Sequence, residues 1–212
     1  MKEKIFIPIA DNGMGLSRTS WAISMFALGL SKVLDKYEVI AQGISYPYPD
    51  GVMNISTADF LESGAERMLV IDTDEIFNPS HVEILMSHDL PFVSGIYPKK
   101  KVGLEFPIMP LESNLTPFAD GQPVPVEVAR CARGFLNVHR SVFEEMKSSV
   151  SKYVDAETGR EQWEFWKKLP GGHSEDFEFC DRYRQFGGKV MVDKRCTAQH
   201  EGSCVYPIKG TY

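Results

Sequence analysis

Apolar runs of strand length alternate with helical segments along the first 98 residues, and this alternation restricts the fold more than any other feature. The predicted strands are residues 5–10, 37–44, 68–71 and 92–97. The helical segments between them are residues 18–34, 56–63 and 78–88. Strands that alternate with helices form a largely parallel sheet. The pattern therefore predicts an α/β, Rossmann-like fold with a mainly parallel central sheet flanked by helices.

The second half of the chain begins with an irregular, proline-rich insertion between Lys99 and Val128. Regular structure returns with a run at 134–138, a helix near 141–148, a helix at 174–186 and a strand at 189–192. The 212 residues, 43% of them hydrophobic, suffice for one well-buried core. We expect a single domain, with a nucleotide-sugar-binding half (1–98) and an acceptor-binding, catalytic half (99–212).

Composition excludes several classes of protein. A net charge of −6 lowers the expectation of a broadly basic, nucleic-acid-coating surface, although a local basic groove remains compatible with it. No stretch is apolar enough to predict a signal peptide or a membrane span. The four cysteines lack CxxC spacing, which favours reduced thiols in a cytoplasm over a zinc site or a disulfide framework.

Two carboxylates, Asp72 and Asp74, follow the apolar strand 68–71. Strand periodicity turns both to one side, and open α/β sheets bind ligands beyond the carboxyl ends of their strands. Carboxylate oxygens are ligands that Mg²⁺ and Mn²⁺ prefer. The alternative is that the two aspartates only cap the following turn.

A second acidic pair, Glu175 and Asp176, opens a predicted helix with Ser174 at its N-cap. Asp176 shares a helix face with Phe179 and Tyr183. A carboxylate on the inward face can serve as a general base, whereas helix capping is the alternative. His200 follows the last predicted strand and could join Asp72 and Asp74 around a metal, or be an ordinary packed histidine.

These features together resemble the GT-A glycosyltransferases, which use nucleotide-sugar donors. The resemblance rests on the Asp-x-Asp of Leu69–Asp74, on Gly134-Phe135 before a Ser-Val-Phe helix, on Ser174-Glu175-Asp176 and on His200. It runs from the first strand to His200 and leaves the proline-rich insertion uncovered. The resemblance implies a nucleotide-sugar donor, with UDP as the nucleotide, and a Mn²⁺ or Mg²⁺ ion.

The resemblance also implies roles for individual residues. Asp74, helped by Asp72, would bind the diphosphate-bound metal, and His200 would complete the coordination. Asp176 would be the catalytic base of an inverting transfer, and Glu175 would contact the acceptor or its neighbours. In that family the first β-loop-α and the helix before the Asp-x-Asp strand hold the nucleotide, which implies four nucleotide contacts here in addition to Asp72: Ala10, Asp11, Arg18 and Asn54.

The acceptor is less constrained. The segment Val93–Lys100 is similar to small virus-encoded GT-A proteins, some of which glycosylate hydroxymethylated bases in DNA. A phosphate-binding groove could be formed by Lys99, Lys100, Lys101, Arg130, Arg133, Arg182 and Arg184, or these could be solvated surface charges. Trp163, Phe165 and Trp166 could stack on a sugar or base, or anchor their loop in the core. A glycan or small molecule is the alternative acceptor.

Three other functions compete. A nucleotidyltransferase can also use an Asp-x-Asp and a metal, but Gly13-Met14-Gly15 with only Arg18 is a poor phosphate-gripping loop. An aspartate-nucleophile phosphatase would carry Ser or Thr soon after the motif, where Glu75 and Ile76 stand. A catalytically dead binding module predicts that the acidic elements do not converge on one cleft.

Overall fold

The computed structural model describes residues 2–11, 33–101, 103–112, 123–156, 158–170, 172–202 and 205–206. The helices are α2 (Val33–Lys36), α3 (Pro49–Ser63), α4 (Pro79–Met86), α5 (Arg140–Met146), the 3-10 turn η1 (Lys147–Ser149) and α6 (Glu175–Gln185). Most of the predicted helix 18–34 lies outside the described residues. None of the described helices is long and apolar enough to cross a membrane.

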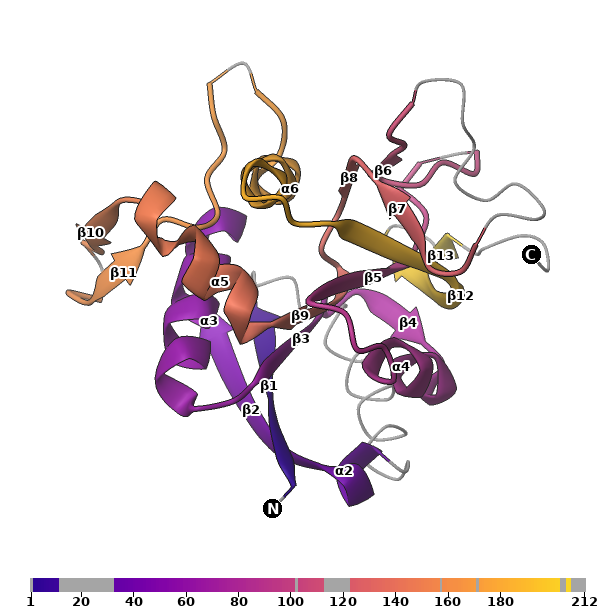
Figure 1. Cartoon of the computed structure of the whole chain (residues 1–212), viewed down its shortest axis with the longest axis horizontal. Coiled ribbons are helices and arrows are strands. Elements are labelled where there is room, and N and C mark those ends of the chain that lie inside the picture. The colour runs from indigo at the N-terminus through magenta and orange to yellow at the C-terminus, as the bar shows by residue number, and fades with distance from the viewer. Residues whose placement is uncertain are drawn as a thin grey trace.

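The strands form one large sheet and two small ones (Figure 1). The large sheet contains β1 (Glu3–Asp11), β2 (Tyr37–Ser45), β3 (Arg67–Ile71), β4 (Glu75–Phe77), β5 (Phe92–Ile96), β7 (Val126–Val128), β9 (Phe135–His139), β12 (Val190–Glu201) and β13 (Val205–Tyr206). The small sheets pair β6 (Ile108–Met109) with β8 (Arg130–Cys131), and β10 (Lys152–Val154) with β11 (Glu161–Trp163).

The order of the large sheet is β13-β12-β5-β9-β3-β1-β2, with β4 and β7 also paired to β12. Strands β1, β2 and β3 are parallel, and β5 is parallel to β12. Strand β9 is antiparallel to both β3 and β5, so these two point the same way. Five strands of the centre therefore share one direction, which confirms the predicted mainly parallel α/β sheet.

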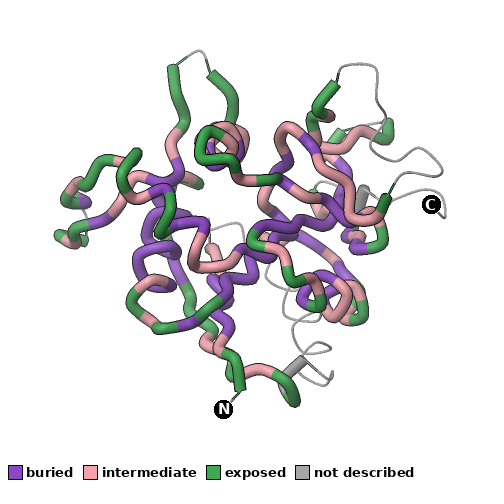
Figure 2. Tube along the Cα trace, in the orientation of Figure 1, coloured by how far each residue is buried: buried purple, intermediate pink, exposed green. Residues whose placement is uncertain are grey.

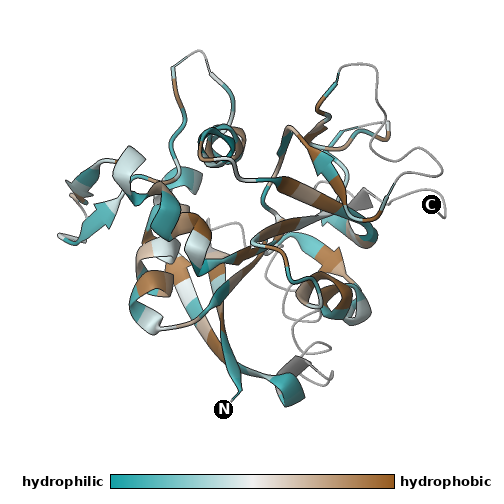
Figure 3. Cartoon of the chain, in the orientation of Figure 1, coloured by the Kyte–Doolittle hydropathy of each residue, from teal (hydrophilic) through white to brown (hydrophobic). Residues whose placement is uncertain are grey.

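Alternating side chains of the central strands fill two cores, one on each face of the sheet. Phe6, Met68 and Val70 join the core covered by α3, α5 and α6, which includes Phe60, Phe143 and Phe179. Ile5, Leu69 and Ile71 face the other way, into the core covered by α4. Strands β3, β5 and β9 are buried along nearly all of their length (Figure 2) and largely hydrophobic, whereas most of the β10–β11 hairpin is hydrophilic (Figure 3). Burial on both faces explains the continuous apolar runs in the sequence.

Two elements differ from the sequence prediction. Helix α3 begins at Pro49, not near Ser56, because Pro49 occupies the first turn and Asp50 adds favourable charge there. Gly51 is required in this turn, since a Cβ would lie 2.2 Å from the Tyr46 ring. Strand β12 continues past Val192 to Glu201, through a register shift before Thr197. His200 therefore lies within the last part of this strand and not after it.

Candidate active site

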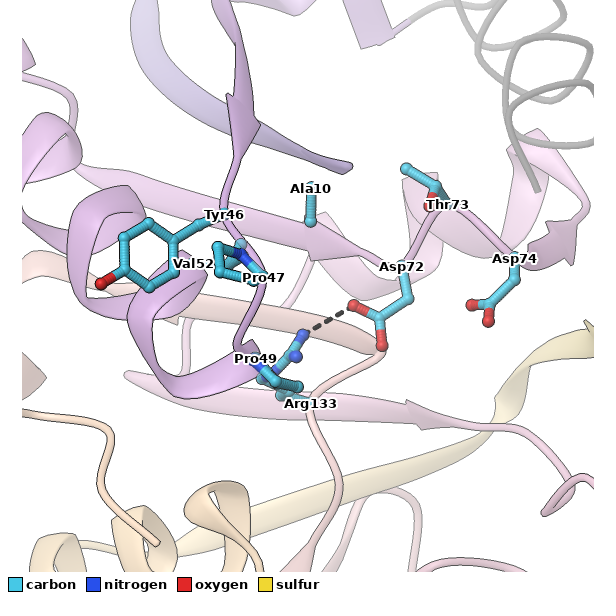
Figure 4. A pocket seen from close by; sticks show the side chains of 9 residues that line it. All are labelled: Ala10, Tyr46, Pro47, Pro49, Val52, Asp72, Thr73, Asp74 and Arg133. Carbon is cyan, nitrogen blue, oxygen red and sulfur yellow. Dashed lines mark hydrogen bonds and ion pairs between the residues drawn. The ribbon is translucent and has the colours of Figure 1, made fainter. Parts of the chain in front are cut away.

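A cavity of about 320 Å³ opens at the carboxyl ends of the parallel strands β1, β2 and β3 (Figure 4). This is the edge at which an open α/β sheet binds its ligands. The side chains that line the cavity are Ala10, Tyr46, Pro47, Pro49, Val52, Asp72, Thr73, Asp74 and Arg133. The predicted Asp-x-Asp element thus lines a cavity, opposite a wall formed by Tyr46 and prolines.

Asp72 is fixed by the turn that precedes β9. Its backbone N–H donates to the carbonyl of Gly134 at 2.9 Å, and its carboxylate accepts from Arg133 Nη1 at 2.6 Å. Gly134 leaves room for this arrangement, because a Cβ there would lie 2.8 Å from the Tyr97 hydroxyl and 3.1 Å from Asp72 Oδ2. The Gly134 N–H donates to the same hydroxyl at 2.9 Å.

Arg133 contacts both acidic elements, the Asp-x-Asp and the Glu-Asp pair, which lie far apart in the sequence. Its side chain is 11% exposed, and Nη2 lies 3.8 Å from Glu175 Oε1 while Nη1 binds Asp72. Burial raises the pKa of Glu175, and the charge of Arg133 opposes that rise. Asp72 and Glu175 therefore both pair with the Arg133 guanidinium.

Asp74 lies between Lys100 and His200. Lys100 Nζ pairs with its Oδ2, and His200 Nε2 lies 3.6 Å from the same atom. Burial alone would raise the pKa of Asp74, but its interactions with His200 and Lys100 outweigh burial and lower the pKa to about 2. Asp74 is therefore held as a carboxylate.

His200 presents one particular nitrogen to this site. Its Nδ1 donates to the carbonyl oxygen of Pro98 at 2.9 Å, and its ring packs edge-on against Tyr97. A proton on Nδ1 leaves Nε2 with the lone pair that a metal requires. Nε2 is also the atom that faces the carboxylates of Asp74 and Glu75.

Glu75 is a candidate site residue that the sequence alone did not single out. Its side chain is fully buried, Oε1 lies 3.7 Å from His200 Nε2, and neither carboxylate oxygen has a hydrogen-bond partner among the described residues. Burial raises the pKa of Glu75 well above its usual range, and the charges of Asp72 and Asp74 raise it further. The available signal was a third acid directly after the Asp-x-Asp.

Asp74, Glu75 and His200 form a group whose ligand atoms all lie within 4.8 Å of one another. Two carboxylates and an imidazole suit Mn²⁺, and carboxylates suit Mg²⁺. A buried, unpartnered carboxylate is costly unless a cation or a proton compensates it. The residues present therefore fit a divalent metal ion.

The Glu-Asp element stands at the start of α6, as predicted. Ser174 is the N-cap residue, but its hydroxyl donates to Asp176 instead of capping the helix. Phe179 and Tyr183 are buried in the core, so they anchor the helix whose first turn carries the two carboxylates. The role of Asp176 as a base stays a prediction.

Of the predicted nucleotide contacts, Ala10 lines the cavity and Asn54 does not. Ala10 lines the cavity, and Asp11 ends β1, with its side chain outside the described part of the structure. Arg18 lies outside the described residues. Asn54 is buried, and its amide makes two hydrogen bonds of 2.9 Å with the backbone of Trp166. The cavity lining does not include it.

The candidate acceptor residues are mostly engaged within the protein. Lys99 and Lys101 pair with Glu105, Arg130 with Asp181, and Arg182 donates to two backbone carbonyls. Lys100 and Arg133 are the two that reach the site. Phe165 and Trp166 are core residues, and Trp166 stacks on Phe179 at 4.0 Å.

By sequence, no protein-family model and no characterised protein matches this chain. Solved structures do match its fold. A Drosophila β1,4-galactosyltransferase 7 mutant, in complex with manganese, UDP-Gal and xylobiose, superposes with a TM-score of 0.53 at 13% identity, over 94% of this chain and 71% of that one. The fold resembles that of GT-A glycosyltransferases.

Two further solved structures give the same result. A viral protein from STIV has a TM-score of 0.52 at 15% identity, over 95% of this chain and 86% of that one. A UDP-glucose pyrophosphorylase complexed with UDP-glucose has a TM-score of 0.50 at 10% identity, over 92% and 90%. The α/β fold is thus one that glycosyltransferases and nucleotidyltransferases share.

Proposed function

We propose that this chain is a metal-dependent glycosyltransferase that moves a sugar from a UDP-sugar to an acceptor hydroxyl, with inversion at the anomeric carbon. One observation carries the proposal: Asp74 lines the same cavity as Asp72 and also groups with Glu75 and His200, while Arg133 links Asp72 to the Glu-Asp element of α6. Arg133, between Asp72 and Glu175, supports the proposal of a donor site next to the start of α6.

The cavity has two chemically different walls. Tyr46, Pro47 and Val52 offer apolar and aromatic surface for a nucleoside, and Arg133 offers charge for a diphosphate. A Mn²⁺ or Mg²⁺ ion bound by the Asp74 group would neutralise charge on the leaving nucleoside diphosphate. Lys100, which pairs with Asp74 and belongs to the proline-rich insertion, would also neutralise charge on the leaving diphosphate.

The transfer itself would use the start of α6. Asp176 takes the proton of the acceptor hydroxyl as its oxygen attacks the anomeric carbon, and the bond to the diphosphate breaks on the opposite face. Glu175, held by Arg133, contacts the acceptor or its neighbours. A single displacement of this kind inverts the configuration.

The test is hydrolysis of a nucleotide-sugar panel with Mn²⁺, read as nucleoside diphosphate release. We expect metal-dependent release from a UDP-sugar by the wild type, loss of release in Asp74→Ala, and normal release in the control Asp89→Ala, whose side chain is fully exposed. Silence across the panel, with no donor-induced thermal shift, would contradict the proposal. Pyrophosphate formation from UTP and a sugar phosphate would show a nucleotidyltransferase instead.

The acceptor is tested separately. Hydroxymethylated DNA and a glycan or small-molecule hydroxyl are the two candidate acceptors, and most of the candidate groove residues pair with groups of the protein itself. Transfer of labelled sugar to a glycan panel and to hydroxymethylated duplex DNA, with unmodified DNA as control, separates the two. NMR of the product gives the anomeric configuration.

A further inference from the structure

We propose that the divalent cation is bound by Asp74, Glu75 and His200, and that Asp72 is not a ligand but holds Arg133 in place. The proposal rests on the proposed function only for what the cation does. It changes the ligand set implied by the sequence, which paired Asp74 with Asp72.

Glu75 and His200 face each other by strand pairing. Strand β4 pairs antiparallel with β12, and Glu75 is directly opposite His200 in that register. Opposed residues of an antiparallel pair project to the same face of the sheet. The backbone of Asp74 is tied to the same strand, since the Glu201 N–H donates to its carbonyl at 2.7 Å. The three side chains are thus fixed by one ladder.

Asp72 is committed elsewhere. Its Oδ1 accepts from Arg133 at 2.6 Å, and it does not belong to the group whose ligand atoms lie within 4.8 Å. A metal bound through Asp72 would compete with Arg133, which is 11% exposed, for the charge of one carboxylate. No such cost attaches to Glu75, whose oxygens accept no hydrogen bond from the described residues.

The proposed set has suitable chemistry. Two carboxylates balance the charge of a divalent ion, and the Nδ1 hydrogen bond to Pro98 directs the His200 lone pair on Nε2 toward them. Three protein ligands leave the remaining positions of a six-coordinate ion for water and phosphate oxygens. Asp72 then orients Arg133 toward the Glu-Asp element.

The experiment measures Mn²⁺ binding by the full chain, from the electron paramagnetic resonance signal of free Mn²⁺, with and without UDP. The variants are Glu75→Gln, Glu75→Asp, Asp72→Asn and the control Glu144→Gln, an exposed carboxylate on α5. Circular dichroism and thermal unfolding of each metal-free variant show whether it folds. If Glu75→Gln does not fold, Glu75→Asp, which keeps the charge but shortens its reach, carries the comparison.

We expect Glu75→Gln to weaken Mn²⁺ binding by about tenfold or more, as loss of a ligand should exceed loss of a residue that only supports one. Asp72→Asn and Glu144→Gln should change it by less than about threefold, because neither carboxylate is a ligand in the proposed set and a screened charge interaction contributes little. Equal losses in Asp72→Asn and Glu75→Gln, unchanged binding in Glu75→Gln, or no Mn²⁺ binding by the wild type would each overturn the inference.

The outcome is separable from that of the proposed function. The expected Mn²⁺ pattern without any nucleotide-sugar turnover would support the ligand set and reject the glycosyltransferase. Metal-dependent turnover with a wild-type Mn²⁺ affinity in Glu75→Gln would support the transferase and reject the ligand set.

Discussion

Replacing Arg133 by methionine tests the link between the two acidic elements. Methionine keeps the length and apolar stem of the side chain but removes the cation that joins Asp72 to Glu175. The 2.6 Å hydrogen bond to a charged group contributes about 1.5–3 kcal/mol. The 3.8 Å pair with Glu175 adds about 0–1 kcal/mol once solvent screening is allowed for. We expect the variant to lose about 3 kcal/mol of its free energy of unfolding.

Urea unfolding near neutral pH, followed by tryptophan fluorescence, measures this loss. In a domain of this size a loss of about 3 kcal/mol corresponds to a melting temperature lower by roughly 6–12 °C. Arg130→Met is the matched control, because its 2.7 Å pair with Asp181 is more exposed and should contribute about 1 kcal/mol or less. Nucleotide-sugar turnover should fall in Arg133→Met and persist in Arg130→Met.

The pH dependence supplies a second readout. The folded pKa of Glu175 is raised, so the folded state favours its protonated form and loses stability as pH rises from the usual carboxyl range to that raised value. Without the Arg133 charge the pKa should rise further, and the deficit of the variant should grow with pH across this window. Stability within about 0.5 kcal/mol of wild type, or an equal loss in Arg130→Met, would refute the reasoning.

Three further substitutions test other parts of the site. Gly134→Ala should cost about 1–3 kcal/mol by thermal unfolding and reduce turnover, because the added Cβ would lie 2.8 Å from the buried Tyr97 ring; a neutral result would show that the ring moves freely. Asn54→Ala should lose about 2–4 kcal/mol, since it leaves two buried backbone groups of Trp166 unpaired; lost donor binding with full stability would instead restore Asn54 as a nucleotide contact. Asp176→Asn should lower turnover by about 10²- to 10⁴-fold with donor affinity unchanged in a thermal-shift titration, and full activity would exclude it as the base.

Local patterns sufficed to predict the sheet and the position of the Asp-x-Asp. Runs such as 68–71 are continuous and apolar because both faces of the sheet are covered, and the acids that follow them lie at the carboxyl edge. The sequence predicts a last strand that ends at residue 192, because the three charged residues that follow, Asp193-Lys194-Arg195, do not indicate a sheet interior. In the structure Asp193 is fully buried and paired with Arg195 and His88.

The fine structure of the site could not be predicted from the sequence, because it depends on contacts between distant segments. Glu75 becomes a candidate ligand only because β4 pairs with β12. This pairing brings it opposite His200, which lies 125 residues later in the chain. Arg133 was one of several basic candidates, and nothing local distinguished it from Arg130. The sequence was equally compatible with aromatic loop residues that bind a ligand and with ones that pack in the core. In the structure Trp166 packs against Phe179.

Strand β12 also sets the order in which the site can come into existence during synthesis. Asp74 and Glu75 leave the ribosome early, but the imidazole that faces them is carried by a strand near the other end of the chain. A nascent chain would therefore hold two adjacent acids without the third side chain of the group. The proposed cation site would be complete only after β12 has paired with β4, a long-range pairing of the kind that folds slowly.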